Sequence, residues 1–352
     1  MMSLYTYLEM AKLYREMEGV VRFKELGAFV SGYYPFMSDI VLLKDCIRDG
    51  EGYIYGYSSA LNKKVCLEFE ALCPAISFGR IKAFLDADHI DFKTYIIAAD
   101  YTKLDFYIHY PATWRYLQEC FELEEAKSHI PSTAIVRDSL REVLYEPKLL
   151  LTTLGNGCRA MVDVNSHVIS SVGSYACHFY NCDIRQYRAY AAIFNSKLFS
   201  YCFYQEYTTA KKEGTGRNVV LRNLLFPHLD KIEGYTILSN LVECLMYLTR
   251  PYLPQISPTI PNDRLQLYMT EIMNMVVYEM YFPTYMKVHN LDVISHMLSA
   301  PFMIEMAPED SRIYETYLWY QRPDNSVRQK LDLLDSRSPE LLYPIHTFKP
   351  YE

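Results

Sequence analysis

The spacing of apolar residues changes twice along the chain. From Leu4 to Met17 apolar residues recur at intervals of three and four, which predicts an amphipathic helix. From Lys24 the intervals shorten and glycines appear, and short apolar runs bounded by glycine or charged residues predict strands. Beyond Gly234 nearly all of the chain shows helical spacing again. The pattern predicts an α+β protein.

These changes divide the chain into an N-terminal helix (1–23), a mixed α/β domain (24–232) and a helical C-terminal region (233–352). The strands that we expect are residues 40–43, 95–98, 106–110, 149–154 and 219–226. The main helices that we expect are residues 114–127, 187–204, 237–248, 264–282 and 286–299. Residues 50–57 fit either a loop or a hairpin, and Gly155-Asn156-Gly157 is typical of a turn.

Charge is distributed unevenly. The formal net charge is −7, which argues against a protein that coats nucleic acid by charge alone. Residues 210–222 nevertheless carry four cations and one anion, a local charge of +3, which leaves −10 for the rest of the chain. This basic segment fits a local DNA contact and a solvated loop equally well.

The first 22 residues mix charged and apolar side chains, so we expect no secretion signal and a cytoplasmic protein. The uncharged stretch 164–182 is interrupted by Ser, Asn and His, so we expect no membrane span. The nine cysteines form no CxxC pair, which argues against a disulfide framework and a zinc ribbon. Cys177, His178 and Cys182 have spacing that zinc could use, but they lack a second ligand pair, and core packing is the preferred interpretation. We therefore expect no metal and no cofactor.

Motifs of several enzyme classes are absent. The chain has no NPPY tetrapeptide, GxSxG elbow, GxxxxGK[ST] loop or HExxH helix. Asp91 and Lys93, with Asp88 nearby, match half of a metal-dependent nuclease site, but short matches of this kind are common by chance. We therefore expect a protein that is not an enzyme.

Residues 146–229 carry a family resemblance. The segments EPKLLLTTLGNGCRAMVD, YRAYAAIFNSKLFSYCFYQ and GTGRNVVLRNLLFPHLD follow one another in this region. Their order resembles the target-recognition domain of TaqI-type and related type IIG restriction-methyltransferases, in which a PKI strand precedes a helix marked LLNSKL and a PIP-like tripeptide. Here Asn195 to Leu198 match the helix mark, and Phe226 to His228 stand where the tripeptide is expected.

Other segments extend the resemblance to most of residues 24–294. They are LGAFVSGYYPFMSDIVLL, LEFEALCPAISFGRIKAF, YPATWRYLQECFELEEAK and IMNMVVYEMYFPTYMKVHNLDVI. In fused members of the family a methyltransferase domain precedes this region, whereas here about one helix does. The resemblance therefore implies a separate specificity subunit that recognises double-stranded DNA together with an adenine-specific DNA methyltransferase or a nuclease subunit.

In such a module Arg and Lys would fix the register on phosphates, while Arg, Asn or Gln would read base edges. The candidate DNA-binding residues are Asn156, Arg159, Lys211, Lys212, Arg217, Asn218 and Arg222, with Arg80 and Lys82 beside Gly79 in a second loop. Tyr33 and Tyr34 could stack on bases, although packing is the preferred interpretation. The Met-rich and aromatic stretch 268–285 could dock on the catalytic partner, although core packing is again preferred.

Two other functions stay open from the residues alone. One is an acidic interaction or regulatory protein that binds the methyltransferase without touching DNA, which the negative net charge favours. The other is a metal-dependent nuclease that uses Asp88, Asp91 and Lys93.

Overall fold

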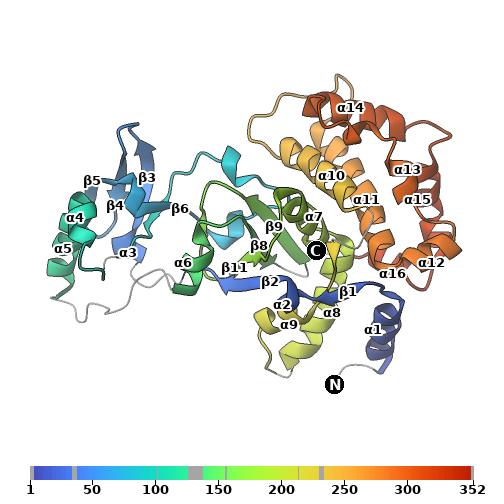
Figure 1. The fold of residues 1–352 in the computed structure, drawn as a ribbon, viewed down its shortest axis with the longest axis horizontal. Coiled ribbons are helices and arrows are strands. Elements are labelled where there is room, and N and C mark those ends of the chain that lie inside the picture. Colours follow the sequence, from blue (N-terminus) through green and yellow to red (C-terminus); the bar gives the residue numbers. More distant parts are fainter. Residues whose placement is uncertain are drawn as a thin grey trace.

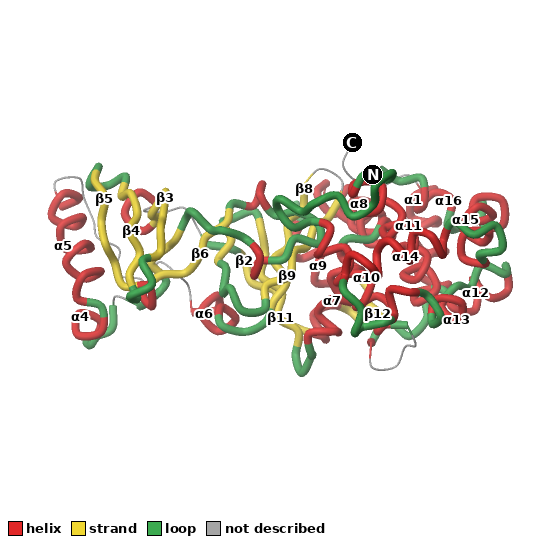
Figure 2. The backbone as a smooth tube through the Cα atoms, turned by 90° about the horizontal axis from the view of Figure 1, so that it is seen from above, coloured by secondary structure: helices red, strands yellow, loops and turns green. Residues whose placement is uncertain are grey.

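The computed structural model describes residues 4–33, 38–100, 102–125, 138–154, 157–212, 214–229 and 234–349. The chain has an α+β fold, as predicted, with several sheets and many helices. Figures 1 and 2 show an elongated molecule with a small β-rich lobe at one end, a central sheet and a large helical part at the other end.

The small lobe is built on a six-stranded sheet in the order β10-β6-β7-β3-β4-β5. Its strands are β3 (Leu42–Arg48), β4 (Tyr53–Ser58), β5 (Lys63–Glu68), β6 (Leu72–Ile76), β7 (Tyr95–Ile97) and β10 (Ile169–Ser170). Helix α5 (Pro111–Glu125) packs on β5. The carboxylate of Glu68 accepts hydrogen bonds from the backbone N–H groups of Ala112 and Thr113 at 2.7 and 2.8 Å. It thereby satisfies two otherwise unpaired donors in the first turn of α5.

A four-stranded antiparallel sheet occupies the centre of the molecule, in the order β2-β11-β8-β9. Its strands are β2 (Gly27–Ser31), β8 (Lys148–Leu154), β9 (Gly157–Asp163) and β11 (Ser174–Phe179). Leu150 and Ala176 face the core of the small lobe, whereas Leu149, Leu151 and Cys177 face a second core. Because both faces are covered, three leucines, Leu149 to Leu151, follow one another in β8 instead of alternating with exposed polar residues.

Two consecutive helices cover the second face of this sheet. Helix α7 (Ile184–Phe194) begins with a capping box between Asp183 and Gln186, and α8 (Lys197–Lys212) follows after a short break. At the break, the Asn195 side chain accepts from the N–H of Ala160 at 2.8 Å and donates to its carbonyl at 3.0 Å. This pair of bonds to β9 explains why the helix predicted over 187–204 is interrupted.

Residues near the N-terminus complete the central part. Helix α1 (Leu4–Glu16) contacts α8, and β1 (Val20–Arg22) pairs antiparallel with β12 (Leu225–Pro227). Helix α2 (Phe23–Leu26) follows β1 in the chain, and α9 (Arg217–Asn223) precedes β12. The pairing of β1 with β12 brings α2 into contact with α9.

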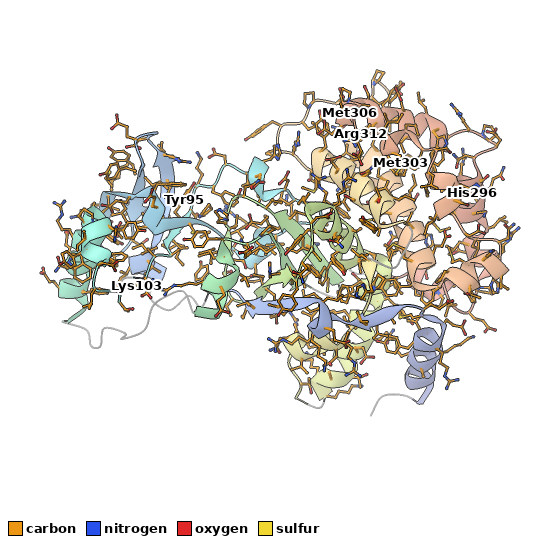
Figure 3. All side chains as sticks on the ribbon, in the orientation of Figure 1. Tyr95, Lys103, His296, Met303, Met306 and Arg312 are labelled. Carbon is orange, nitrogen blue, oxygen red and sulfur yellow. The ribbon has the colours of Figure 1, made fainter. Side chains whose placement is uncertain are left out.

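The helical part shares a core with the central sheet. Helix α10 (Tyr235–Leu248) packs on α7 and on α11 (Asn262–Tyr281). The remaining helices are α12 (Pro283–Val288), α13 (Ile294–Met297), α14 (Glu309–Tyr320), α15 (Ser326–Arg337) and α16 (Tyr343–His346). Arg312, labelled in the helical part in Figure 3, is almost fully buried and pairs with Glu243 at 2.9 Å. In the described part of the chain, no helix combines the length and the apolar character that crossing a bilayer requires.

Three strand predictions were wrong. Residues 106–109 form helix α4 (Phe106–His109), residues 217–223 form α9 before the short β12, and α3 (Ser38–Val41) occupies the first half of the run 40–43. A short apolar run is compatible with either a strand or one helical turn, so its period does not decide between them. The strands predicted at 95–98 and 149–154 are confirmed, and residues 53–58 pair with β3 as a hairpin.

Candidate nucleic-acid interface

Several of the predicted DNA-binding residues meet at one end of the central sheet. At this end β8 finishes at Leu154, β9 begins at Gly157 and β11 begins at Ser174, which pairs with Thr152. Arg159 lies on β9 opposite Thr152 and is half-buried. Asn156 is outside the described residues.

Arg217 joins α9 to this end of the sheet. Its guanidinium NH1 donates to the carbonyl of Thr153 at 2.7 Å and lies 3.3 Å from the Thr153 hydroxyl. The same guanidinium lies over the ring of Tyr207, 5.0 Å from the ring centroid, where a cation–π interaction stabilises it. Burial raises the pKa of the neighbouring Tyr175, and the positive charge of Arg217 acts in the opposite direction.

Helix α9 is tied to the opposite edge of the sheet by Arg222, whose NH2 donates to the carbonyl of Phe29 at 3.0 Å. Asn218 is exposed on the same helix. Lys211 and Lys212 are exposed in the last turn of α8, where their positive charges interact favourably with the carbonyl end of the helix. The described part of the basic segment therefore consists of the end of α8, with its two lysines exposed to solvent, and of α9, which is anchored on the sheet.

The second predicted loop reaches the same end of the sheet. Phe78 donates its backbone N–H to the Ser171 hydroxyl at 3.0 Å, and the 3-10 turn Phe78–Arg80 contacts β8. Further along, the N–H of Phe84 donates to Ala160 on β9 at 3.1 Å. Arg80 and Lys82 are both exposed. The two loops lie more than a hundred residues apart in the sequence, and they flank the same pair of strand ends.

Two exposed cations were not predicted. Arg22 at the end of β1 and Lys24 in α2 lie beside α9, because β1 pairs with β12 and α2 contacts α9. No local sequence signal could have identified them, since the pairing joins segments about two hundred residues apart. We define the basic end as the described cations of this region, which are Arg22, Lys24, Arg80, Lys82, Arg159, Lys211, Lys212, Arg217 and Arg222.

Other candidates from the sequence have structural roles. Tyr33 is only 9% exposed and its backbone bridges to Ser171, so it cannot stack on a base; Tyr34 lies outside the described residues. Met269, Met273, Met275 and Met280 on α11 are buried, so these methionines pack in the core, as the preferred interpretation predicted. Docking of the helical C-terminal region (233–352) on a partner stays a prediction.

The nuclease and zinc candidates do not converge on a metal site. The Asp88 carboxylate accepts hydrogen bonds from Asn165 and Ser166, whereas Asp91 and Lys93 pair with each other on the surface at 2.7 Å. Cys177 is fully buried, and Nδ1 of the adjacent His178 lies 2.9 Å from the Tyr187 hydroxyl. Among the described residues, no three His, Cys, Asp or Glu side chains are grouped as a metal would require.

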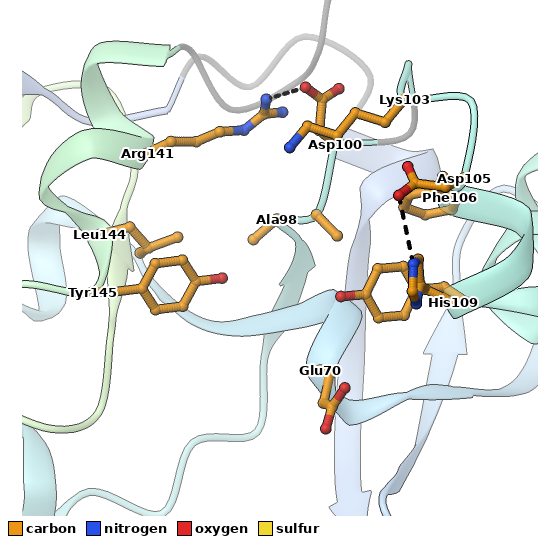
Figure 4. Close-up of a pocket in the computed structure, with 12 residues that line it drawn as sticks. Glu70, Ala98, Asp100, Lys103, Asp105, Phe106, His109, Arg141, Leu144 and Tyr145 are labelled. Atoms are coloured by element: carbon orange, nitrogen blue, oxygen red, sulfur yellow. Dashed lines mark hydrogen bonds and ion pairs between the residues drawn. The ribbon is translucent and has the colours of Figure 1, made fainter.

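A separate pocket of about 320 Å³ lies between the small lobe and α6 (Asp138–Leu144), and no residue of the basic end lines it (Figure 4). It is lined by the segment that follows β7, by α4 and by the end of α6. Arg141 and Asp100 form an ion pair at 2.5 Å on its wall. No motif in the sequence predicts this pocket, because its lining residues are spread from Glu70 to Tyr145.

No protein-family model matches the chain, and no curated protein sequence matches it. The resemblance to target-recognition domains therefore stays a prediction, and function has to be argued from the geometry of the described residues.

Proposed function

We propose that this chain recognises double-stranded DNA through the basic end, as the specificity subunit of a bacterial restriction-modification system. The observation that carries the proposal is that the two segments predicted from the sequence, residues 78–82 and 211–222, are both anchored at one end of the central sheet, through Ser171 and Thr153. A chain with a net charge of −7 thereby gathers nine described cations in one region. Local concentration of cations is what phosphate binding requires.

The geometry also supports a division of labour within the basic end. Arg217 and Arg222 are held by backbone carbonyls at 2.7 and 3.0 Å, so their guanidinium groups are positioned before any ligand arrives. Lys211 and Lys212 are exposed and fit phosphate contacts, which set affinity but carry no sequence information. Arg159 and Asn218 are the described candidates for reading base edges.

On this proposal, the catalytic steps belong to a partner, an adenine-specific methyltransferase or a nuclease subunit in the cytoplasm. The partner would contribute the rest of the surface that contacts DNA, which suits a chain whose basic end is small.

The first experiment measures binding of fluorescently labelled duplex DNA to the purified chain by anisotropy across a series of salt concentrations. We expect Lys211→Ala/Lys212→Ala to weaken binding of all duplexes. The magnitude of the slope of log K against log salt should fall by about 1.8, since each lost phosphate contact removes about 0.9. Lys287→Ala is the matched control, because this exposed lysine lies on α12 in the helical part.

Retention of the unchanged slope by the double variant would remove α8 from the interface. Absence of duplex binding at low salt, together with co-purification of a methyltransferase, would favour the acidic interaction protein instead. Cleavage of plasmid DNA by the chain with magnesium would favour the nuclease.

A further inference from the structure

The pocket between the small lobe and α6 has walls suited to a planar ring. Four of its lining residues are aromatic, namely Phe106, His109, Tyr110 and Tyr145. Tyr145, which directly follows α6, points into the pocket (Figure 4). Tyr110 packs against Phe106 with ring centroids 5.2 Å apart. A flat ring that enters here would contact aromatic side chains contributed by two different segments.

One side of the pocket offers a cation. Burial by itself would raise the pKa of Asp100. Hydrogen bonds from Thr102 and the ion pair with Arg141 outweigh this effect, so the pKa of Asp100 is lowered. Asp100 therefore stays charged and neutralises Arg141. The side chain of Lys103 extends towards this pair (Figure 4), and its ammonium has no hydrogen-bond or ion-pair partner in the described ranges. This side of the pocket is suited to an anionic group.

The other side offers acceptors. Glu70 lies on the side of the pocket away from Lys103 (Figure 4), and no described residue pairs with its carboxylate. Burial raises the pKa of Tyr110, and the charges of Glu70, Asp105 and Glu68 raise it further. Because these carboxylates make the region around Tyr110 negative, it is suited to an N–H donor on the ligand.

We propose that this pocket binds a single nucleotide whose base carries an exocyclic amino group. Its base would lie against Tyr145 and Tyr110, its phosphate would bind Lys103, and its amino group would donate to Glu70. The volume of about 320 Å³ is at the small end of ligand pockets, which range over roughly 300–1,000 Å³, so it fits one nucleotide rather than a longer strand. Free nucleoside monophosphates and an unpaired nucleotide within a DNA strand share this chemistry. The proposal does not depend on duplex recognition by the basic end.

Isothermal titration calorimetry of the whole chain tests the ligand class with AMP, IMP, adenosine and inorganic phosphate. We expect AMP to bind about tenfold more tightly than IMP, which has a carbonyl in place of the amino group, and about tenfold more tightly than adenosine, which lacks the phosphate. CMP and UMP form a second pair with the same expected order. Inorganic phosphate alone should bind too weakly to measure.

Two exposed side chains provide the decisive variants. Lys103→Met should reduce AMP binding to the level of adenosine and leave adenosine unchanged, whereas Glu70→Gln should remove the preference for AMP over IMP. Lys64→Met, an exposed lysine on β5 that does not line the pocket, is the matched control. Since Lys103, Glu70 and Lys64 are all exposed, these variants should fold like the parent.

Labelled duplexes with and without one unpaired adenosine distinguish the two sources of the nucleotide. Tighter binding of the duplex with the unpaired nucleotide, lost in Lys103→Met, would assign the pocket to DNA; binding of free AMP alone would assign it to a soluble ligand. Absence of binding by every monophosphate and by the unpaired nucleotide would overturn the proposal, as would binding that Lys103→Met leaves unchanged. The Lys211→Ala/Lys212→Ala variant separates the two functions, because it should weaken duplex binding and leave AMP binding intact.

Discussion

Lys148 and Asp163 form an ion pair in the interior of the protein, with 2.8 Å between Nζ and Oδ2 and at most 1% of either side chain exposed. The two residues are cross-strand partners on β8 and β9. Lys148 also donates to the carbonyl of Leu144 at 2.7 Å, and Asp163 accepts from the N–H of Val168 at 2.7 Å. The pair therefore connects α6, the central sheet and the segment that leads to β10.

Lys148→Met should lower the free energy of unfolding by about 3–5 kcal/mol, because it leaves the Asp163 charge buried without its counter-ion. The double variant Lys148→Met/Asp163→Leu should recover most of that loss, since it removes both charges. Urea denaturation measures the change. Lys93→Met is the control, because it breaks the exposed pair with Asp91 and should cost about 0–1 kcal/mol. Equal costs for Lys148→Met and Lys93→Met would contradict the prediction.

Phe23 joins the N-terminal segment to three other parts of the chain. Its fully buried ring lies 5.2 to 5.4 Å, centroid to centroid, from Phe29 on β2, Phe179 on β11 and Phe226 on β12. Phe23→Ala should therefore cost about 3–5 kcal/mol of stability through the lost burial and the cavity that remains. Phe23→Leu should cost less because it fills part of that cavity.

Leu104→Ala, at a side chain 93% exposed, is the control and should change the urea midpoint little. A similar midpoint for Phe23→Ala and Leu104→Ala would show that this aromatic cluster is not required for stability.

The sequence predicted most of the long helices and the buried strands, because these segments show their period over many residues. The helix predicted over 286–299 was wrong, since this run contains the end of α12 and the short α13 with a break between them. The run at 237–248 lies within α10, and the run at 149–154 lies within β8. The strand predicted over residues 219–226 was wrong for most of its length, because residues 217–223 form α9. A strand would place Val219 and Leu221 on one face, whereas α9 buries Val220 and Leu221 and leaves Val219 46% exposed. Three adjacent apolar residues fit both patterns, and only packing against the sheet and α8 decides between them.

The candidate interface was predictable in part, for a similar reason. A local excess of charge marks Lys211 to Arg222 in the sequence, but nothing local marks Arg22 or Lys24, which reach α9 through the pairing of β1 with β12. The pocket between the small lobe and α6 could not be predicted either, because residues from Glu70 to Tyr145 come together only when β7, α4 and α6 are in place.

His346 should make stability depend on pH. Burial lowers the pKa of His346 below its ordinary value of 6.5, and the positive charge of Lys197 lowers it further, while Asp335 acts in the opposite direction. In the described structure its Nδ1 is buried without a hydrogen-bond partner. The unfolded chain therefore takes up a proton at a higher pH than the folded chain does. The contribution of His346 to stability is fully present above about pH 6.5 and is lost as the pH falls below it.

The measurement is the urea midpoint of the parent and of His346→Gln between pH 5 and pH 8. The parent should lose stability towards pH 5 more steeply than the variant does, and the two curves should run parallel above pH 7. Parallel curves over the whole range would mean that His346 has the same pKa in the folded and the unfolded chain.

Arg217 tests whether the anchored part of the basic end touches DNA or only supports it. One of its N–H groups is committed to Thr153, and the guanidinium has further donors in a fixed fork that a phosphate can accept. Arg217→Met should weaken duplex binding and lower the salt slope by about 0.9 if the group neutralises one phosphate. Arg217→Lys should keep the salt slope, because the positive charge remains. It should nevertheless bind duplex DNA more weakly, because an ammonium cannot hold Thr153, lie over Tyr207 and contact DNA in the same geometry. Arg250→Met is a close control, since Arg250 also lies over a tyrosine, 4.7 Å from the ring centroid of Tyr247, but in the helical part. An unchanged slope in Arg217→Met with a lower urea midpoint would make Arg217 a support for the end of β8, and the phosphate contacts would then have to come from the exposed lysines alone.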